Sequence, residues 1–159
     1  MNAARRDPPG APAKGPGTAL RLFAYGTLQV GQAASSRLEV IAAEPGTMEG
    51  FRLYDSGLGW PFVAPGRAGD VVHGQVLTLA GDDTSAARVD AAFARADEWE
   101  DYDPGDPAGS LYLRQRVEAT TVSGHRLEVH VYLSSEERLQ RHHAGQRATY
   151  LERGIWTTR

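Results

Sequence analysis

Residues 126–133 alternate strictly between two kinds of side chain. Leu127, Val129, Val131 and Leu133 fall on one face of an extended chain, and polar or amphipathic residues fall on the other. Because successive side chains of a β-strand point to opposite faces, this period of two predicts a strand with one buried face. The preceding segment, Tyr112 to Val122, is joined to it by Ser123-Gly124, a pair typical of a tight antiparallel turn. The pattern therefore predicts a β-hairpin and requires a sheet in the fold.

Further segments complete the predicted architecture. Strands are expected at residues 20–25, 50–54 and 71–79, which are short and rich in apolar or aromatic side chains. Two helices are expected, one opening at Asp82-Asp83-Thr84-Ser85 and one spanning about Ser135 to Arg147. Strands and helices do not alternate as they would in a doubly wound parallel sheet. The sequence therefore predicts an α+β fold whose mixed, mostly antiparallel sheet is able to curl into a barrel.

The apolar stripe of the first predicted helix runs into an acidic residue. Ala86, Val89, Phe93 and Ala96 recur at helical spacing, and four residues further the same stripe reaches Glu100. Burying a carboxylate costs on the order of several kcal/mol unless its surroundings compensate. Two interpretations follow. Either Glu100 continues the buried face, or the helix ends one turn earlier and Glu100 is solvated.

Composition limits both the size of the fold and its chemistry. The chain has 159 residues, and four of its nine prolines fall within residues 8–16. This Pro/Gly/Ala-rich segment predicts a disordered tail over residues 1–18, which leaves residues 19–159 as a single domain. The absence of cysteine excludes a disulfide framework, a thiolate nucleophile and cysteine-ligated metals. Any chemistry must therefore use oxygen or nitrogen groups.

The charge balance argues against polyanionic partners. Seventeen Lys and Arg residues oppose 20 Asp and Glu residues, which gives a formal net charge of −3. This supplies no basic surface for nucleic acid or an anionic membrane. No run of 18 apolar residues is present, and Arg5-Arg6 is not followed by the apolar segment of a secretory signal. We expect a cytoplasmic protein that binds neither nucleic acid nor membrane, and the sequence predicts no oligomeric state.

A glycine turn closes the first predicted strand. Tyr25-Gly26-Thr27-Leu28 follows the apolar residues of that strand. Glycine lets a backbone approach a ligand, and successive N–H groups in such a turn form a concave site for a carboxylate or an oxyanion. The alternative interpretation is a turn that only connects two elements, with Tyr25 packed in the core.

Five short motifs follow one another in a characteristic order. They are Tyr25-Gly26-Thr27-Leu28, Trp60-Pro61, Val72-His73-Gly74-Gln75-Val76, Asp97-Glu98-Trp99-Glu100-Asp101-Tyr102-Asp103 and Tyr112-Leu113-Arg114. Together they resemble the gamma-glutamylcyclotransferase-like (AIG2-like) family over about residues 20–133. Each motif is weak alone, but five in the same order with compatible spacing are specific.

The resemblance implies a fold and a reaction. The fold is a small mixed, mostly antiparallel β-barrel flanked by helices, with a cavity at one end. Family enzymes cyclise a γ-glutamyl group, whose own α-amine attacks the γ-carbonyl and releases pyroglutamate (5-oxoproline) and a free amine. The implied partner is a small-molecule γ-glutamyl substrate, and no cofactor or metal is implied because the substrate carries its own nucleophile. The family's catalytic acid maps onto Glu100, which is expected to act as general acid and base.

The resemblance also implies substrate-binding residues. Residues 25–28 (Tyr25, Gly26, Thr27 and Leu28) match the loop that holds the γ-glutamyl group, and Trp60 matches a cavity wall. Tyr112 and Arg114 match a Tyr-x-Arg strand and would share a face that points into the cavity. Alternatively, Arg114 forms a structural ion pair with Glu118 or Asp101. Trp99 and Trp156 are expected to be packing residues.

One position departs from the family pattern. Asp101 follows Glu100 where the family commonly has glycine. It is expected either to raise the pKa of Glu100 as a like charge or to face solvent. The adjacent histidines His142-His143 diverge by about 100° on a helix, which favours a solvated face over a metal site.

Two other functions remain compatible with the sequence. The first is a non-catalytic small-ligand binding or interaction protein that keeps the cavity. The second is a different acyl-transfer or hydrolytic reaction in the same cavity, for which Asp101 is the indication. A binder has no need of a buried acid, so Glu100 favours an enzyme.

Overall fold

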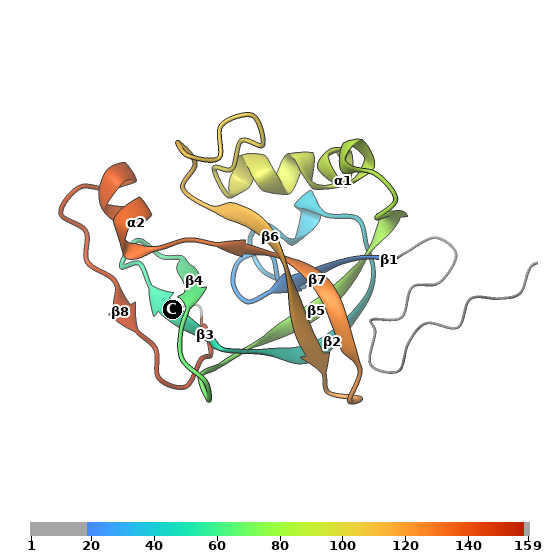
Figure 1. Ribbon diagram of the computed structural model, residues 1–159, viewed down its shortest axis with the longest axis horizontal. Coiled ribbons are helices and arrows are strands. Elements are labelled where there is room, and N and C mark those ends of the chain that lie inside the picture. The colour runs from blue at the N-terminus through green and yellow to red at the C-terminus, as the bar shows by residue number, and fades with distance from the viewer. Residues whose placement is uncertain (1–18, 158–159) are drawn as a thin grey trace, which may run out of the picture.

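The computed structural model describes residues 19–157 of the chain (Figure 1). Its elements in chain order are β1 (Ala19–Ala24), η1 (Ser35–Arg37), β2 (Val40–Glu49), β3 (Phe51–Asp55), β4 (Pro61–Pro65), β5 (Val71–Asp82), α1 (Ala86–Trp99), β6 (Leu113–Thr121), β7 (Arg126–Leu133), α2 (Glu136–His142) and β8 (Thr149–Tyr150). The disordered tail predicted for residues 1–18 lies outside the described residues.

Five strands close into a barrel in the order β1-β5-β2-β6-β7. Neighbouring strands are antiparallel except at the closure, where Leu22 of β1 pairs in parallel with His130 of β7. A second sheet has the order β4-β3-β8, and in Figure 1 α1 lies across the barrel whereas α2 lies beside this second sheet. The predicted α+β fold, a mixed and mostly antiparallel barrel flanked by helices, is confirmed.

The hairpin of β6 and β7 forms as its alternation predicts, but both faces of β7 become buried toward its end. Leu113 pairs with Leu133 and Thr120 with Arg126. From Val129 to Leu133 every residue is buried, because α1 covers the face that carries the polar residues. His130 on this face packs against Phe93 of α1, with ring centroids 5.1 Å apart.

Helix α1 begins and ends where its sequence signals place it. The Ser85 hydroxyl caps the helix by accepting a hydrogen bond from the backbone N–H of Arg88 at 3.2 Å. Val89, Phe93 and Ala96 of the predicted stripe are buried in the core, whereas Ala86, its first residue, is exposed. The helix runs to Trp99, so it does not end one turn early. Glu100, the next residue on the stripe, is its C-cap.

Three strands escape the sequence prediction. Strand β2 contains Pro45-Gly46, residues that usually interrupt strands. A Cβ atom on Gly46 would lie 2.9 Å from the carbonyl oxygen of Thr120, so glycine at this position lets β2 approach β6. Strand β4 starts and ends with proline, and β8 has only two residues. These strands are stabilised by pairing with other strands, which a pattern in the local sequence does not reveal.

Helix α2 is shorter than predicted. It ends at His142, whereas the sequence predicts a helix to about Arg147. The chain turns at Gly145, which has a φ of 84°, a left-handed conformation that glycine adopts without strain. The early end places His143 outside the helix.

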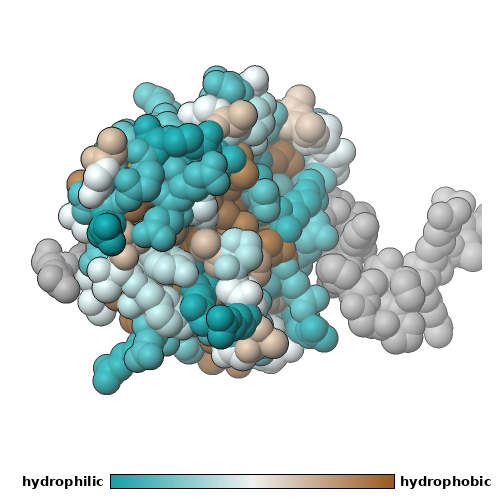
Figure 2. Space-filling model, turned by 60° about the vertical axis from the view of Figure 1, so that its left-hand side comes forward, coloured by the Kyte–Doolittle hydropathy of each residue, from teal (hydrophilic) through white to brown (hydrophobic). Residues whose placement is uncertain are grey.

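The surface of the protein is largely polar on the face that Figure 2 shows. Apolar residues show between the polar ones in the central part of this face. Within residues 19–157, no helix combines the length and the apolarity that crossing a membrane requires.

Candidate active site

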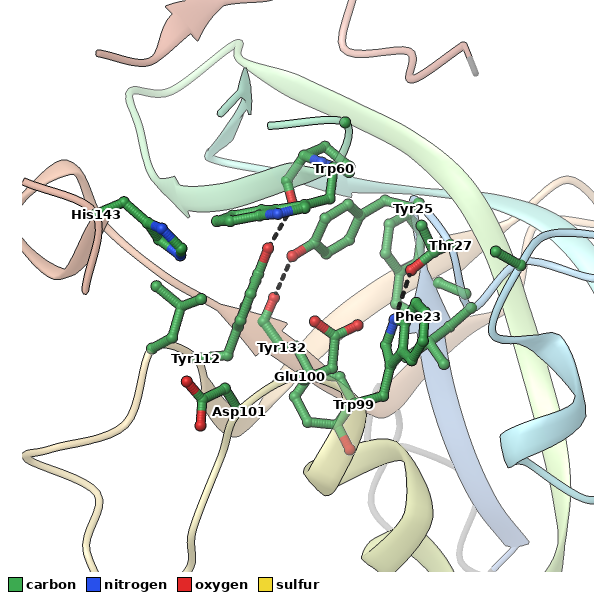
Figure 3. A pocket seen from close by; sticks show the side chains of 17 residues that line it. Phe23, Tyr25, Thr27, Trp60, Trp99, Glu100, Asp101, Tyr112, Tyr132 and His143 are labelled. Carbon is green, nitrogen blue, oxygen red and sulfur yellow. Dashed lines mark hydrogen bonds between the residues drawn. The ribbon is translucent and has the colours of Figure 1, made fainter. Parts of the chain in front are cut away.

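A cavity of about 450 Å³ lies among loops that come from distant parts of the sequence (Figure 3). Its lining comes from the turn after β1, the β3–β4 loop, the end of α1, the residues before β6, strand β7 and the residue after α2. The lining residues are Phe23, Ala24, Tyr25, Gly26, Thr27, Leu28, Ala33, Gly59, Trp60, Pro61, Trp99, Glu100, Asp101, Leu111, Tyr112, Tyr132 and His143. All predicted site residues except Arg114 line this cavity.

Glu100 lies in the middle of the cavity view in Figure 3 and is half-buried. Its backbone N–H still donates to Ala96 at 2.9 Å, which continues the helical turn. Within the described residues its carboxylate accepts no hydrogen bond. Burial raises the pKa of Glu100 to about 8, and the charge of Asp97 adds to the shift. Of the two sequence interpretations, the structure agrees with the one in which the helix continues, and Glu100 is partly buried at its end.

Asp97 lies one turn earlier in α1 and differs from Glu100, because its carboxylate is buried and has hydrogen-bond partners. It accepts a hydrogen bond from the Tyr132 hydroxyl at 2.6 Å and one from Nε of Arg114 at 3.0 Å. The guanidinium of Arg114 also pairs with Asp90 at 2.7 Å and lies 4.7 Å from the ring centroid of Phe93. These contacts hold Nε and Nη2 of the guanidinium against the carboxylates of α1.

The structure therefore corrects the expectation for Arg114. Its side chain does not line the cavity, and its ion pairs are with Asp97 and Asp90 rather than Glu118 or Asp101. The expected shared face does not exist because β6 begins at Leu113, which leaves Tyr112 outside the regular alternation of the strand.

The loop after β1 combines a core contact with unpaired backbone donors. Tyr25 is buried and its hydroxyl donates to the carbonyl oxygen of Tyr132 at 2.6 Å. A Cβ atom on Gly26 would lie 2.8 Å from Cγ of Pro61, so glycine lets this loop pack against Pro61. Within the described residues, the backbone N–H groups of Gly26, Thr27 and Leu28 donate no hydrogen bond to the protein.

The opposite wall is aromatic. The Tyr112 hydroxyl donates to the carbonyl oxygen of Pro61 at 2.6 Å, and burial raises the pKa of Tyr112 well above its usual value. The ring centroid of Trp60 lies 5.8 Å from that of Tyr112 and 5.9 Å from that of His143. Trp60 is therefore a wall of the cavity, as predicted.

The glycine motif of β5 supports the cavity from outside. A Cβ atom on Gly74 would lie 2.9 Å from the ring of Phe23, so glycine allows Phe23 to pack beside the cavity. The side-chain oxygen of Gln75 accepts a hydrogen bond from the backbone N–H of Val30 at 2.9 Å. This motif holds β1 and its following loop in place without lining the cavity.

Three lining residues with polar side-chain groups, Trp99, Tyr132 and His143, were not among the predicted site residues. Trp99, expected to be only a packing residue, is 43% exposed and its indole N–H donates to the Thr27 hydroxyl at 3.1 Å. The alternation of residues 126–133 places Tyr132 on the polar face of its strand, and the signal that the sequence offers is an aromatic residue among charged ones. His143 was expected on a solvated helix face, and only the early end of α2 brings it to the cavity.

Asp101 faces solvent, which was one of its two expected positions. Its side chain is 71% exposed, and Asp97 rather than Asp101 is the carboxylate that raises the pKa of Glu100. His142 contacts Asp101, with Nδ1 3.6 Å from Oδ2. Within residues 19–157, no three His, Asp or Glu side chains gather closely enough to hold a metal ion.

Comparison with known sequences gives one family. Residues 22–158 match the family described as gamma-glutamyl cyclotransferase, AIG2-like. A comparison with curated proteins finds no match.

Solved structures share the fold at low sequence identity. An AIG2-like protein from Mus musculus has a TM-score of 0.59 at 21% identity, over 88% of this chain and 89% of that one. The Bacillus subtilis protein YkqA has a TM-score of 0.56 at 20% identity over 87% of this chain, which spans 40% of the length of YkqA. An Arabidopsis thaliana protein has a TM-score of 0.55 at 20% identity, over 92% of this chain and 74% of that one. At such identities the similarity establishes the fold.

Proposed function

We propose, from the premise that the chain belongs to the AIG2-like gamma-glutamyl cyclotransferase family, that it releases pyroglutamate and a free amine from a γ-glutamyl amine or amide. Glu100 is the general acid and base of this reaction. The observation that carries the proposal is that Glu100 is a half-buried carboxylate in a largely aromatic cavity, without a hydrogen-bond partner in the described residues. A carboxylate in such surroundings is available to exchange a proton with a ligand.

The proposed reaction needs one proton carrier. The ionised carboxylate of Glu100 accepts a proton from the α-ammonium group of the substrate. The amine nitrogen then attacks the γ-carbonyl carbon, and the carbonyl oxygen takes the negative charge. Glu100 returns its proton to the departing nitrogen, and the C–N bond breaks. The attacking nitrogen still carries one excess proton, which passes through Glu100 to the released amine, so that pyroglutamate with a neutral lactam and an ammonium ion leave. The proton transfers are balanced because Glu100 ends in the state in which it began.

The raised pKa of Glu100 suits both halves of this cycle. With a pKa of about 8, about one Glu100 in ten is ionised at pH 7. A group with a pKa near the working pH accepts and returns a proton with a small free-energy difference, which is the condition for efficient acid and base catalysis.

The loop after β1 supplies the complementary site. The N–H groups of Gly26, Thr27 and Leu28 lack acceptors within the described residues, so they are available to the substrate carboxylate or to the oxyanion of the tetrahedral intermediate. Tyr25, Trp60 and Tyr112 complete the proposed γ-glutamyl site by shaping the cavity. Folding a short chain into a reactive ring-closing geometry supplies much of the rate enhancement in intramolecular reactions.

The proposed substrate is a small molecule, and the proposed location is the cytoplasm. The second of these rests on the absence of cysteine, which is typical of proteins that need no oxidising compartment.

A panel of γ-glutamyl amines and γ-glutamyl amino acids tests the reaction, with pyroglutamate measured by mass spectrometry. We expect product from at least one substrate, and Glu100→Gln to lower kcat by a factor of about 10² to 10⁴. The Gln variant keeps the shape of the side chain and removes only its acid–base chemistry, so circular dichroism and ligand affinity should be preserved. Full activity in a folded Gln variant would overturn the role of Glu100. Binding of the panel without any turnover would establish a non-catalytic binding protein instead.

A further inference from the structure

Trp99 joins the end of α1 to the loop after β1. Its indole N–H donates to the hydroxyl oxygen of Thr27 at 3.1 Å, and both residues line the cavity (Figure 3). Within the described residues, this is the only hydrogen bond between α1 and residues 25–34. Trp99 directly precedes Glu100 in the sequence. The bond therefore connects the proposed acid to the loop whose backbone N–H groups are unpaired.

The direction of this hydrogen bond constrains the hydroxyl of Thr27. An indole N–H can only donate, so the Thr27 oxygen is the acceptor. Because the indole hydrogen occupies the side of this oxygen that faces Trp99, the hydroxyl hydrogen must point elsewhere. Within the described residues it meets no acceptor. The Thr27 hydroxyl is therefore available to donate to an oxygen atom of a ligand, beside the N–H groups of residues 26–28.

The ring of Trp99 is also held by η1. The guanidinium carbon of Arg37 lies 4.8 Å from the centroid of this ring, within the range of cation–π attraction. Arg37 donates to the carbonyl oxygen of Arg95 at 3.2 Å, and Arg95 donates to that of Ser36 at 3.4 Å. These reciprocal bonds fasten η1 to α1. The indole is thus held at its nitrogen and at its ring, although Trp99 is 43% exposed.

We propose that Trp99 is a positioning residue, which sets the Thr27 hydroxyl as a hydrogen-bond donor to an oxygen atom of the γ-glutamyl group. This inference rests on the proposed cyclotransferase function. Through Thr27, the same bond keeps the donors of the loop after β1 at a fixed place relative to Glu100. Such an arrangement lowers the cost of ordering the site during the reaction.

Two substitutions separate this role from packing. Trp99→Phe keeps an aromatic ring and removes the N–H, whereas Thr27→Val keeps the shape of threonine and removes the hydroxyl. We measure kcat/KM with the substrate of the γ-glutamyl panel that gives the most pyroglutamate. We expect Thr27→Val to lower it about ten- to hundredfold and Trp99→Phe about three- to tenfold. Thr27→Ser restores the hydroxyl and should remain within about threefold of the native protein.

The double variant decides whether Trp99 acts through Thr27. If it does, Trp99→Phe has almost no further effect once residue 27 is valine, and the double variant matches Thr27→Val within about twofold. Additive losses, or no loss in Trp99→Phe, overturn the inference.

Trp156→Phe is the matched control for the loss of an indole. The indole nitrogen of Trp156 is buried and has no hydrogen-bond partner within the described residues, and Trp156 does not line the cavity. We expect its kcat/KM to equal that of the native protein. A loss as large as that of Trp99→Phe would assign both effects to packing and overturn the inference.

The indole N–H signals test the hydrogen bond without turnover. The chain has three tryptophans, and Trp99→Phe identifies the signal of Trp99 in a proton–nitrogen correlation spectrum. We expect Thr27→Val to shift this signal and to speed its exchange with solvent, and the signal of Trp156 to stay in place. An unmoved Trp99 signal overturns the inference.

The two levels of the proposal fail in distinguishable ways. Turnover by the native protein with additive effects of the two substitutions overturns the role of Trp99 and leaves the cyclotransferase standing. Absence of pyroglutamate from every substrate of the panel overturns the proposed function, and the inference falls with it.

Discussion

Asp97 and Glu100 lie one turn apart at the end of α1, and their surroundings are opposite. Asp97 is buried, accepts the hydroxyl of Tyr132 and is paired with the guanidinium of Arg114. Glu100 faces the cavity, has no hydrogen-bond partner within the described residues, and has a pKa raised to about 8. Two carboxylates on one helix thus differ mainly in the partners that the barrel supplies. A carboxylate with full partners stabilises the fold, and one without them is available for chemistry.

Tyr132 connects Asp97 to the loop that carries Tyr25. Its hydroxyl donates to Asp97 and its carbonyl oxygen accepts the hydroxyl of Tyr25. The charge of Asp97 also contributes to the raised pKa of Glu100. The structural cluster beneath α1 therefore adjusts the chemistry of the cavity without contacting a ligand.

Removing the partnered carboxylate should have the largest effect on stability. Asp97→Ala leaves the guanidinium of Arg114 buried without its main partner, because both side chains are only 5% exposed. We expect the free energy of unfolding to fall by about 3–5 kcal/mol, measured by urea denaturation.

A double variant is the control for this effect. Asp97→Leu combined with Arg114→Leu removes both charges, and we expect it to be more stable than Asp97→Ala, since no uncompensated charge remains. If Asp97→Ala costs no more than Glu100→Ala does, the contrast between the two carboxylates is wrong.

Removing the charge of Glu100, the unpartnered carboxylate, should stabilise the protein rather than destabilise it, and this gain in stability should depend on pH. The folded pKa of Glu100 is about 8, above its ordinary value of 4.5, so between these values the folded state keeps a proton that the unfolded state releases. The stability of the native protein from this group is complete below about pH 4.5 and is lost as pH rises to about 8.

Glu100→Gln removes that dependence. We expect the variant to gain stability relative to the native protein as pH rises, by up to a few kcal/mol at pH 8, and little at pH 4.5. Thermal melts of both proteins across this range measure the difference. A difference that does not change with pH would contradict the raised pKa of Glu100.

Substitution of Gly26 tests how closely the loop after β1 packs against Pro61. A Cβ atom on Gly26 would meet Cγ of Pro61 at 2.8 Å. We expect Gly26→Ala to cost about 1–3 kcal/mol of stability and to raise KM, because the loop must shift. Adding Pro61→Ala removes the atom that clashes and should restore part of the stability, measured by thermal melting. No recovery would mean that the glycine is required for another reason.

Asp101 gives the smallest predicted effect and tests backbone strain alone. Glycine occupies its φ of 52° freely, whereas alanine has the Cβ atom and no side-chain charge. We expect Asp101→Gly to be more stable than Asp101→Ala by about 1 kcal/mol in denaturant titrations. Equal stability of the two variants would show that the strain at this position is negligible.

Local patterns predicted the elements whose signals are periodic. The alternation of residues 126–133, the cap at Ser85 and the stripe ending at Ala96 all correspond to observed elements. The stripe also pointed to Glu100, although spacing alone favoured a solvated side chain there and the structure buries it in part. The order of five motifs supplied the family, and four of the five contribute residues to the cavity lining.

Other features could not be predicted because they depend on distant partners. Strands β2 and β4 contain proline or glycine, and pairing with neighbouring strands holds them extended. The position of Arg114 depends on Asp97 and Asp90, which belong to a helix that folds over its strand. His143 reaches the cavity only because α2 ends early.

The sequence by itself determined four of the five barrel strands, the helix that leads to Glu100, the absence of thiol chemistry and the family. Only the tertiary structure decided which carboxylate has partners, because the partners of Asp97 come from β6 and β7. It also decided that Glu100 borders a cavity while Arg114 does not. The periodicity of a helix indicates which side chains face inward, but the groups that meet them there are chosen by the closure of the barrel.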